Sequence, residues 1–199
     1  MHSEQICDYW FGEIIDGNTR EDRSALWFGG GDAVDGEIRT RFEADLLAAG
    51  AGEREHWAEN PRGRLALILL LDQFPLNIYR GTARAYDFEA AAVRHCLAGL
   101  AAGQDALLSP IERSFFYMPL EHAEDRELQE RSVACYRSLL EDAPQQLRAG
   151  LQASLDYAIE HRDIVARFGR FPHRNRVLGR EPSRDELDWL AAGGATYGQ

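Results

Sequence analysis

Leu65-Ala66-Leu67-Ile68-Leu69-Leu70-Leu71-Asp72-Gln73-Phe74-Pro75 is the stretch that decides the fold. Residues 65–71 are apolar on every side of a helix, and a helix of that kind must be buried on all its faces. Asn60 and Pro61 precede the run as an N-cap and a first helical residue. The run has no bias toward β-branched residues, which favours a helix over a buried strand. We expect this central helix to end at Phe74, because Pro75 follows.

The rest of the chain also shows helical periodicity and no convincing strand. Helices are predicted near residues 4–15, 33–49, 88–103, 110–118, 125–141 and 145–166, with a last one after Ser183. Asp87 is expected to cap one of them, and capping boxes are expected at Ser109 and Ser183. The sequence therefore predicts an all-α fold of about eight to nine helices, packed as antiparallel hairpins without a β-sheet. A length of 199 residues fits one domain, 1–199.

The composition excludes several classes of protein. The formal net charge is −11, whereas nucleic acids and anionic membranes both require a positive surface, so we expect neither as a partner. All 22 basic residues are arginine, which rules out a lysine Schiff base and a P-loop lysine. No signal-peptide pattern is present, and the longest apolar run is far short of the roughly 20 residues that span a bilayer. Three separate cysteines without a Cys-x-x-Cys pair fit a reducing compartment, and we expect a cytoplasmic protein.

Three segments place unusual polar residues close to Pro or Gly. The first is Leu71–Asn77, the second is Tyr117–Asp125, and the third is Arg167–Arg180, which contains five arginines and a histidine. Pro172 and two glycines prevent the third segment from forming one helix, so its side chains must be aimed by a shaped loop. We expect the three segments to meet in space.

The Arg-rich segment has two interpretations. Arg170, Arg174 and Arg180 offer planar forks for phosphate or carboxylate, and the flexible Gly169 can free backbone N–H groups for the same anion. The alternative is structural, with these arginines consumed by Asp72, Glu121, Glu124 and Asp125, because ion-pair networks also resemble sites. The candidate ligand-binding residues are Asp72, Gln73, Asn77, Glu121, His122, His161, Arg167, Arg170, His173, Arg174, Asn175 and Arg180.

Metal binding and nucleophilic catalysis find little support in the spacing. Glu53-x-x-His56 is a single match that lacks the second Glu-x-x-His of a di-iron bundle, so no metal and no cofactor are predicted. His161 shares a stripe with apolar residues, which favours a core histidine. Gly-x-Ser-x-Gly is absent, and the cysteines lie on apolar helix faces. A pair formed by His122 or His173 with a carboxylate could still act as an acid–base catalyst.

The same three segments resemble a known family. Leu71-Asp72-Gln73-Phe74-Pro75-x-Asn77, Pro119-Leu120-x-His122-x-Glu124 and His161-Arg162-x-Ile164-Val165-x-Arg167-Phe168-Gly169-Arg170-Phe171-Pro172-His173-Arg174-Asn175 look like the uncharacterised bacterial "domain of unknown function 924" family. The resemblance covers almost the whole chain and implies a tetratricopeptide-like all-α fold without an established activity. Two positions depart from the family pattern, with Leu76 in place of Arg and Glu89 in place of Asp.

Two hypotheses of function follow. In the first, the three segments form a pocket that accepts a small anionic ligand, and the question of enzymatic activity stays open. In the second, the protein is a helical-repeat scaffold that binds a protein or peptide, and the polar segments are purely structural. The concentration of unusual residues at three points favours the pocket.

Overall fold

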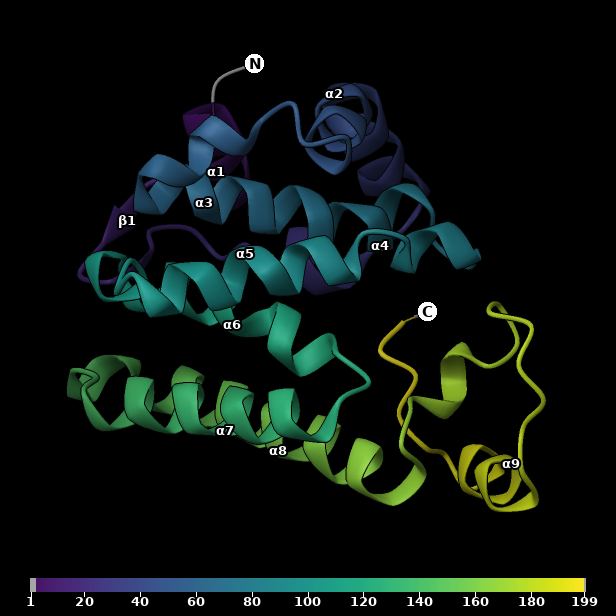
Figure 1. Cartoon of the computed structure of the whole chain (residues 1–199). Helices are drawn as coiled ribbons and strands as arrows, with labels where there is room; N and C mark the ends of the chain where they lie inside the picture. The colour runs from purple at the N-terminus through teal and green to yellow at the C-terminus, as the bar shows by residue number, and fades with distance from the viewer. Residues whose placement is uncertain (1–2, 199) are drawn as a thin grey trace.

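The computed structural model describes residues 3–198, and in this range nine α-helices are joined mostly by short turns (Figure 1). They are α1 (Ser3–Phe11), α2 (Asp32–Gly50), α3 (Pro61–Ile68), α4 (Phe74–Ile78), α5 (Glu89–Ala101), α6 (Pro110–His122), α7 (Arg126–Glu141), α8 (Arg148–Phe168) and α9 (Arg184–Ala191). The prediction of an all-α protein with about eight to nine helices is confirmed. No helix among the described residues is long and apolar enough to cross a membrane.

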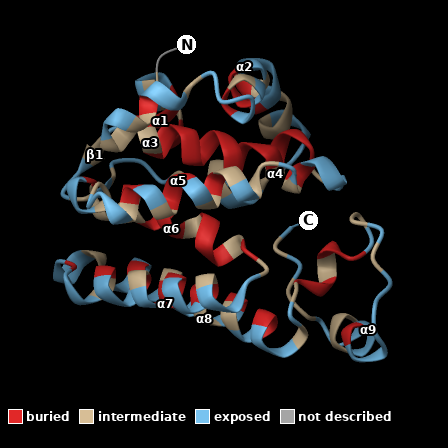
Figure 2. Ribbon diagram, in the orientation of Figure 1, coloured by how far each residue is buried: buried red, intermediate tan, exposed pale blue. Residues whose placement is uncertain are grey.

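Helix α3 lies in the middle of the amino-terminal half and is buried along most of its length (Figure 2). The side chains from Leu65 to Leu71 are at most 1 % exposed. Burying each large aliphatic side chain contributes about 1.5–3 kcal/mol, so this run supplies much of the core. The Asn60 side chain accepts a hydrogen bond from the Gly63 N–H at 2.8 Å, which confirms the predicted N-cap.

Two prolines that were expected to end helices lie inside them. The helix of residues 61–78 continues past Pro75, because a π-helical turn (Leu69–Gln73) separates α3 from α4. The wider turn relieves the clash that a proline ring makes with the preceding helical turn. Proline also has no N–H group, so no backbone donor is left without an acceptor. Helix α6 likewise continues past Pro119 to His122, since tertiary packing of Leu120 holds the last turn in place. Both predicted ends were therefore wrong.

The first predicted helix is also too long. Helix α1 ends at Phe11, and β1 (Ile14–Ile15) pairs with β2 (Asn18–Thr19) in a short antiparallel hairpin. Asp16 and Gly17 form its turn with φ angles of 51° and 87°, the left-handed values of a type I′ turn. The prediction of no β-sheet is thus corrected by this one two-stranded ladder.

The remaining helix starts agree with the sequence except at α5. Capping boxes form at Ser109 and Ser183, as predicted. Asp87, however, does not cap α5, whose N-cap position is Phe88. Helices α7 and α8 pack side by side below α6, with exposed residues along their outer faces (Figure 2). The carboxyl-terminal segment follows α8, bends back through α9 and returns toward α4 (Figure 1).

Candidate functional site

The three polar segments meet around one cavity of about 570 Å³. Of the twelve candidate residues, seven line it: Gln73, Asn77, Glu121, His122, His161, His173 and Arg174. Helix α4 and the π-helical turn supply one wall, the last turn of α6 supplies the floor, and α8 and the Arg-rich segment complete it. The expectation that the segments come together in space agrees with the structure.

Asp72 and His122 form a hydrogen-bonded pair at this floor. The Nδ1 atom of His122 lies 2.9 Å from Oδ1 of Asp72, and the Asp72 side chain is only 2 % exposed. The Gln73 amide donates to the other carboxylate oxygen at 2.5 Å. Burial alone would lower the pKa of His122, but the Asp72 carboxylate outweighs it, and the pKa is raised above its usual value. Asp72 thus lies behind the cavity wall and orients a protonatable imidazole that lines it.

Glu121 and His161 form a second contact on the same floor. Oε1 of Glu121 lies 3.3 Å from Nδ1 of His161, and that nitrogen also lies 2.8 Å from the Tyr157 carbonyl oxygen. A carbonyl oxygen only accepts, so Nδ1 carries the proton and donates. Burial raises the pKa of Glu121 to about 7, while burial and the neighbouring His122 lower the pKa of His161 to about 3. At neutral pH His161 is therefore uncharged and Glu121 is partly protonated.

Arg174 brings a permanent positive charge to the cavity. Its guanidinium group is held between the rings of Tyr86 and Phe171, at 4.6 and 4.5 Å from their centroids, and pairs with Glu89 at 2.9 Å. The arginine is only 5 % exposed. Burial and Arg174 together lower the pKa of the adjacent His173 to about 4, so this imidazole is neutral.

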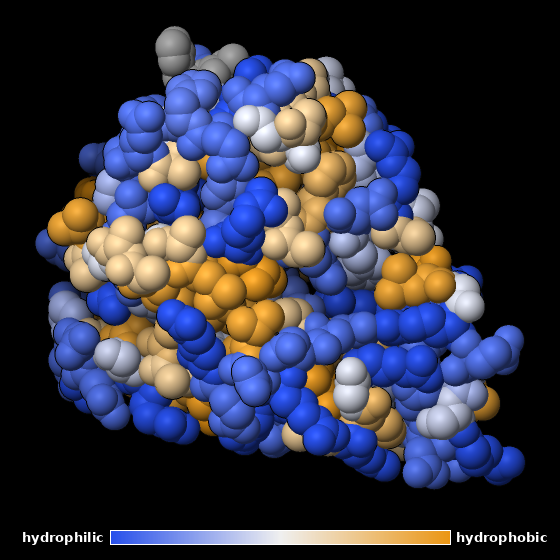
Figure 3. All heavy atoms as spheres, viewed as in Figure 1, coloured by the Kyte–Doolittle hydropathy of each residue, from blue (hydrophilic) through white to orange (hydrophobic). Residues whose placement is uncertain are grey.

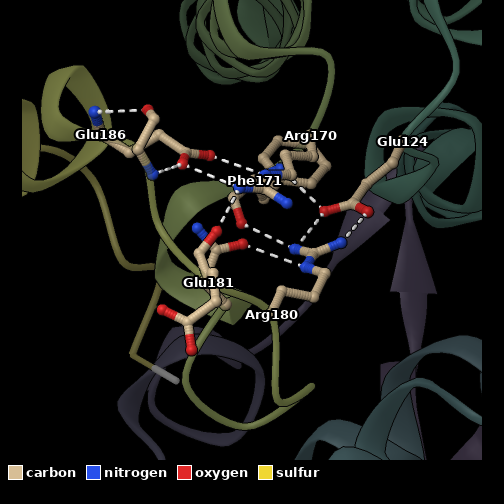
Figure 4. Close-up of polar contacts among 8 residues, drawn as sticks. Glu124, Arg170, Phe171, Arg180, Glu181 and Glu186 are labelled. Atoms are coloured by element: carbon tan, nitrogen blue, oxygen red, sulfur yellow. Dashed lines mark hydrogen bonds and ion pairs between the residues drawn. The ribbon is translucent and has the colours of Figure 1, made fainter.

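Two arginines of the same segment have their charges satisfied inside the protein (Figure 4). Arg170 donates to both carboxylate oxygens of Glu186, at 2.7 and 2.8 Å, and to the Glu181 carbonyl. Arg180 donates to both carboxylate oxygens of Glu124, at 2.5 and 2.9 Å. Neither lines the cavity, so the structural interpretation fits these two residues and the binding interpretation fits only their neighbour, Arg174.

The remaining candidates take supporting positions. Arg167 is exposed, with its guanidinium group 4.6 Å from the Phe168 ring centroid, and it lies outside the cavity lining. Asn175 is buried and accepts from Nε of Arg180 at 3.0 Å. Asn77 lines the cavity and donates to Asp35 at 2.8 Å.

In the space-filling view the lower right of the molecule, over α9 and the carboxyl-terminal segment, is mainly hydrophilic (Figure 3).

The cavity also has lining residues that the sequence analysis did not select. The Gly29-Gly30-Gly31 segment before α2 forms part of its lining. Tyr197 stacks on His161 with ring centroids 4.0 Å apart, and Arg80 donates to the Gly198 carbonyl at 2.9 Å. Glycine clustering was a usable signal for the first element. Nothing in the sequence around Tyr197 marks it.

Glu121, His122 and His161 are also the group best placed to hold a metal ion. One ligand atom from each lies within 4.8 Å of the others. The Nδ1 atoms face Asp72 and the Tyr157 carbonyl, so a metal would have to bind Nε2 of both rings. Glu121 approaches His161 at Nδ1, at 3.3 Å. The absence of a metal stays a prediction.

Comparisons with known proteins agree with this fold. A family model described as "Bacterial protein of unknown function (DUF924)" matches residues 6–194. A solved structure of a protein of unknown function from Agrobacterium tumefaciens is 37 % identical in sequence, with a TM-score of 0.82 over 96 % of this chain and 97 % of that one. No curated protein matches the sequence.

Proposed function

The chain belongs to the DUF924 family, and on that premise we propose that it binds a small anionic molecule in the cavity between α4, α6, α8 and the Arg-rich segment. A volume of about 570 Å³ is in the usual range for small-molecule sites. We further propose a cytoplasmic location, which its three free cysteines support.

Unpaired buried polar atoms are the observation that carries this proposal. Nδ1 of His173, Nε of Arg174 and the hydroxyl of Tyr197 are buried and have no hydrogen-bond partner among residues 3–198, and all three residues line the cavity. Folded proteins satisfy the large majority of buried polar groups, so a cluster of unsatisfied ones at a cavity fits a site completed by a ligand.

The charges around the cavity favour an anion. Arg174 contributes a guanidinium group, and the Asp72 carboxylate raises the pKa of His122, which favours its positively charged form. Glu89 offsets part of the first charge, and Asp72 offsets the second. Arg174 and His122 pair with one carboxylate each. A ligand carboxylate or phosphate group would therefore add charge-assisted hydrogen bonds to both groups.

The test is a thermal-shift panel of phosphorylated metabolites, carboxylates, nucleotides and divalent metals. A ligand at about 100 times its Kd stabilises by roughly 2.7 kcal/mol, which raises the Tm of a chain of this size by roughly 5–10 °C. Arg174→Lys keeps a cation beside Glu89 but loses the planar fork, and the exposed Arg176→Lys is its matched control. We expect an anion to raise the Tm of the wild type and the control but not of Arg174→Lys.

The alternative is a tetratricopeptide-like scaffold for a protein or peptide. In that case no small anion would raise the Tm, and Arg174→Lys would differ from Arg176→Lys only in its unliganded stability. That result would contradict the small-molecule proposal.

A further inference from the structure

A carboxyl group and an imidazole group are neighbours on the cavity floor. Glu121 and His122 are the last two residues of α6, beyond Pro119, and both line the cavity. Both belong to the last turn of α6, which was predicted not to form because of Pro119. Their backbone positions are fixed from α7, where the Gln129 amide donates to the carbonyl oxygens of Glu121 and Ala123, at 2.5 and 2.8 Å.

The imidazole of His122 has one nitrogen held and one free. Nδ1 faces Asp72, and no residue in the range 3–198 forms a hydrogen bond with Nε2. The Asp72 carboxylate is itself fixed by the Gln73 amide and by its place in the π-helical turn. A carboxylate on Nδ1 sets the tautomer and the ring orientation, which leaves Nε2 to exchange a proton with a bound molecule. Asp72 is then a positioning residue.

The carboxyl group of Glu121 is buried, and no arginine in the described part of the chain forms an ion pair with it. Its Oε1 atom lies 3.3 Å from Nδ1 of His161, and that imidazole is neutral. The Tyr136 hydroxyl approaches from α7 and the Glu160 carboxylate acts on it from α8. A buried carboxyl group that lines the cavity is placed to take a proton from a bound molecule, as a general base does.

No strong nucleophile accompanies these two groups among the described residues that line the cavity. None of the lining residues is a cysteine, and the hydroxyl of Ser154 is directed to the Gly150 carbonyl of its own helix at 3.3 Å. A serine without an adjacent base is a weak nucleophile. The chemistry that these side chains support is therefore proton transfer rather than covalent catalysis.

Building on the proposed anion site, we infer that Glu121 and His122 catalyse enolisation of a small carbonyl compound whose anionic group is held by Arg174. The Glu121 carboxylate takes a proton from the carbon next to the carbonyl group, and the C–H electron pair becomes the C=C bond of the enol. The carbonyl oxygen takes a proton from Nε2 of His122. Returning both protons regenerates the carbonyl compound or its isomer, so the reaction needs no oxidant, reductant or co-reactant.

The inference is tested with pyruvate and dihydroxyacetone phosphate as probes in D₂O. ¹H NMR follows the loss of the protons next to the carbonyl group, and isothermal titration calorimetry measures binding of the same probes. We expect the wild type and the exposed-residue control His56→Gln to exchange these protons faster than buffer, with EDTA present. Glu121→Gln should slow exchange by at least about 100-fold while Kd changes by less than about threefold, and His122→Gln should slow exchange and also weaken binding of the anion.

The outcomes separate the two proposals. A probe that binds wild type but keeps its protons would overturn the catalytic role and leave the binding site standing. Failure of both probes and of the wider anion panel to bind would overturn both. Exchange that is abolished by EDTA would assign the chemistry to a metal and contradict the direct role of Glu121. For Asp72→Asn, we expect partial loss of exchange together with a pH profile displaced to lower pH, which a merely structural role would not produce.

Discussion

Nδ1 of His122 and Oδ1 of Asp72 lie 2.9 Å apart although the two residues are 50 positions apart in the sequence. The contact joins the π-helical turn before α4 to the last turn of α6. Because the Asp72 carboxylate favours the protonated imidazole, Asp72→Asn should lower the pKa of His122. A histidine NMR titration measures it, with exposed Asp156→Asn as control. An unchanged pKa in Asp72→Asn would contradict the ion pair.

Two buried neutral histidines predict a loss of stability in acid. The pKa values of His161 and His173 are lowered to about 3 and about 4. Between those values and the unfolded value of about 6.5, the unfolded state binds more protons, so the free energy of unfolding falls as pH drops below about 6.5. Each histidine should cost about 1–2 kcal/mol at pH 5 relative to pH 7.5. Urea unfolding of wild type and His161→Gln checks this, and an identical pH dependence in both would contradict it.

Glu121 predicts the opposite dependence. Its folded pKa of about 7 lies above the unfolded value of 4.5, so the folded state keeps a proton that the unfolded state releases. The free energy of unfolding therefore falls as pH rises from about 4.5 to 7. Glu121→Gln, which is always neutral, should be more stable than wild type by about 1–3 kcal/mol at pH 8 and nearly equal at pH 5. Equal effects at both pH values would refute the raised pKa.

Arg180 should behave as a structural clamp. It bonds both oxygens of Glu124, the Phe171 carbonyl and the Asn175 side chain, so its removal leaves several half-buried groups unpaired. Arg180→Ala should lower the free energy of unfolding by about 2–4 kcal/mol, whereas exposed Arg176→Ala should change it by less than about 0.5 kcal/mol. Chemical denaturation distinguishes them. Similar small effects of the two substitutions would show that Arg180 is not a clamp.

Two glycines offer a matched test of the packing around α3. A Cβ at Gly63 would lie 2.1 Å from the Trp57 carbonyl oxygen, whereas a Cβ at Gly150 in α8 would meet nothing within 4 Å. Gly63→Ala should destabilise by about 1–3 kcal/mol, because backbone must move. Gly150→Ala should stabilise by about 0.5–1 kcal/mol, since alanine is the better helix former. Thermal unfolding of both variants checks the signs, and a neutral Gly63→Ala would contradict the close approach.

Apolar periodicity and N-cap residues correctly predicted the buried helix and several helix starts. The all-apolar run of residues 65–71 could only be buried, and Asn60, Ser109 and Ser183 formed the expected caps. The errors have a common cause. Pro75 persists inside a helix because a π-helical turn and tertiary packing outweigh its local cost of about 3 kcal/mol.

The sequence predicted that the three polar segments meet. It did not predict which of their residues line the cavity and which only form ion pairs inside the protein. Arg170, Arg174 and Arg180 are alike in sequence and each pairs with a carboxylate, and only the fold decides that Arg174 also lines the cavity. Glu186, the partner of Arg170, also belongs to the capping box of α9. The sequence pattern predicts this cap but not the ion pair with Arg170. Tyr197 reaches His161 only because the carboxyl-terminal segment returns across the molecule.

The most direct measurement of the central claim is the histidine NMR spectrum during titration with the anion that raises the Tm most. We predict that His122, His161 and His173 shift together, at the same ligand concentration, because they line one cavity, while exposed His56 stays unchanged. A rise in Tm with none of these three resonances moving, or with His56 moving equally, would contradict an anion site in the cavity.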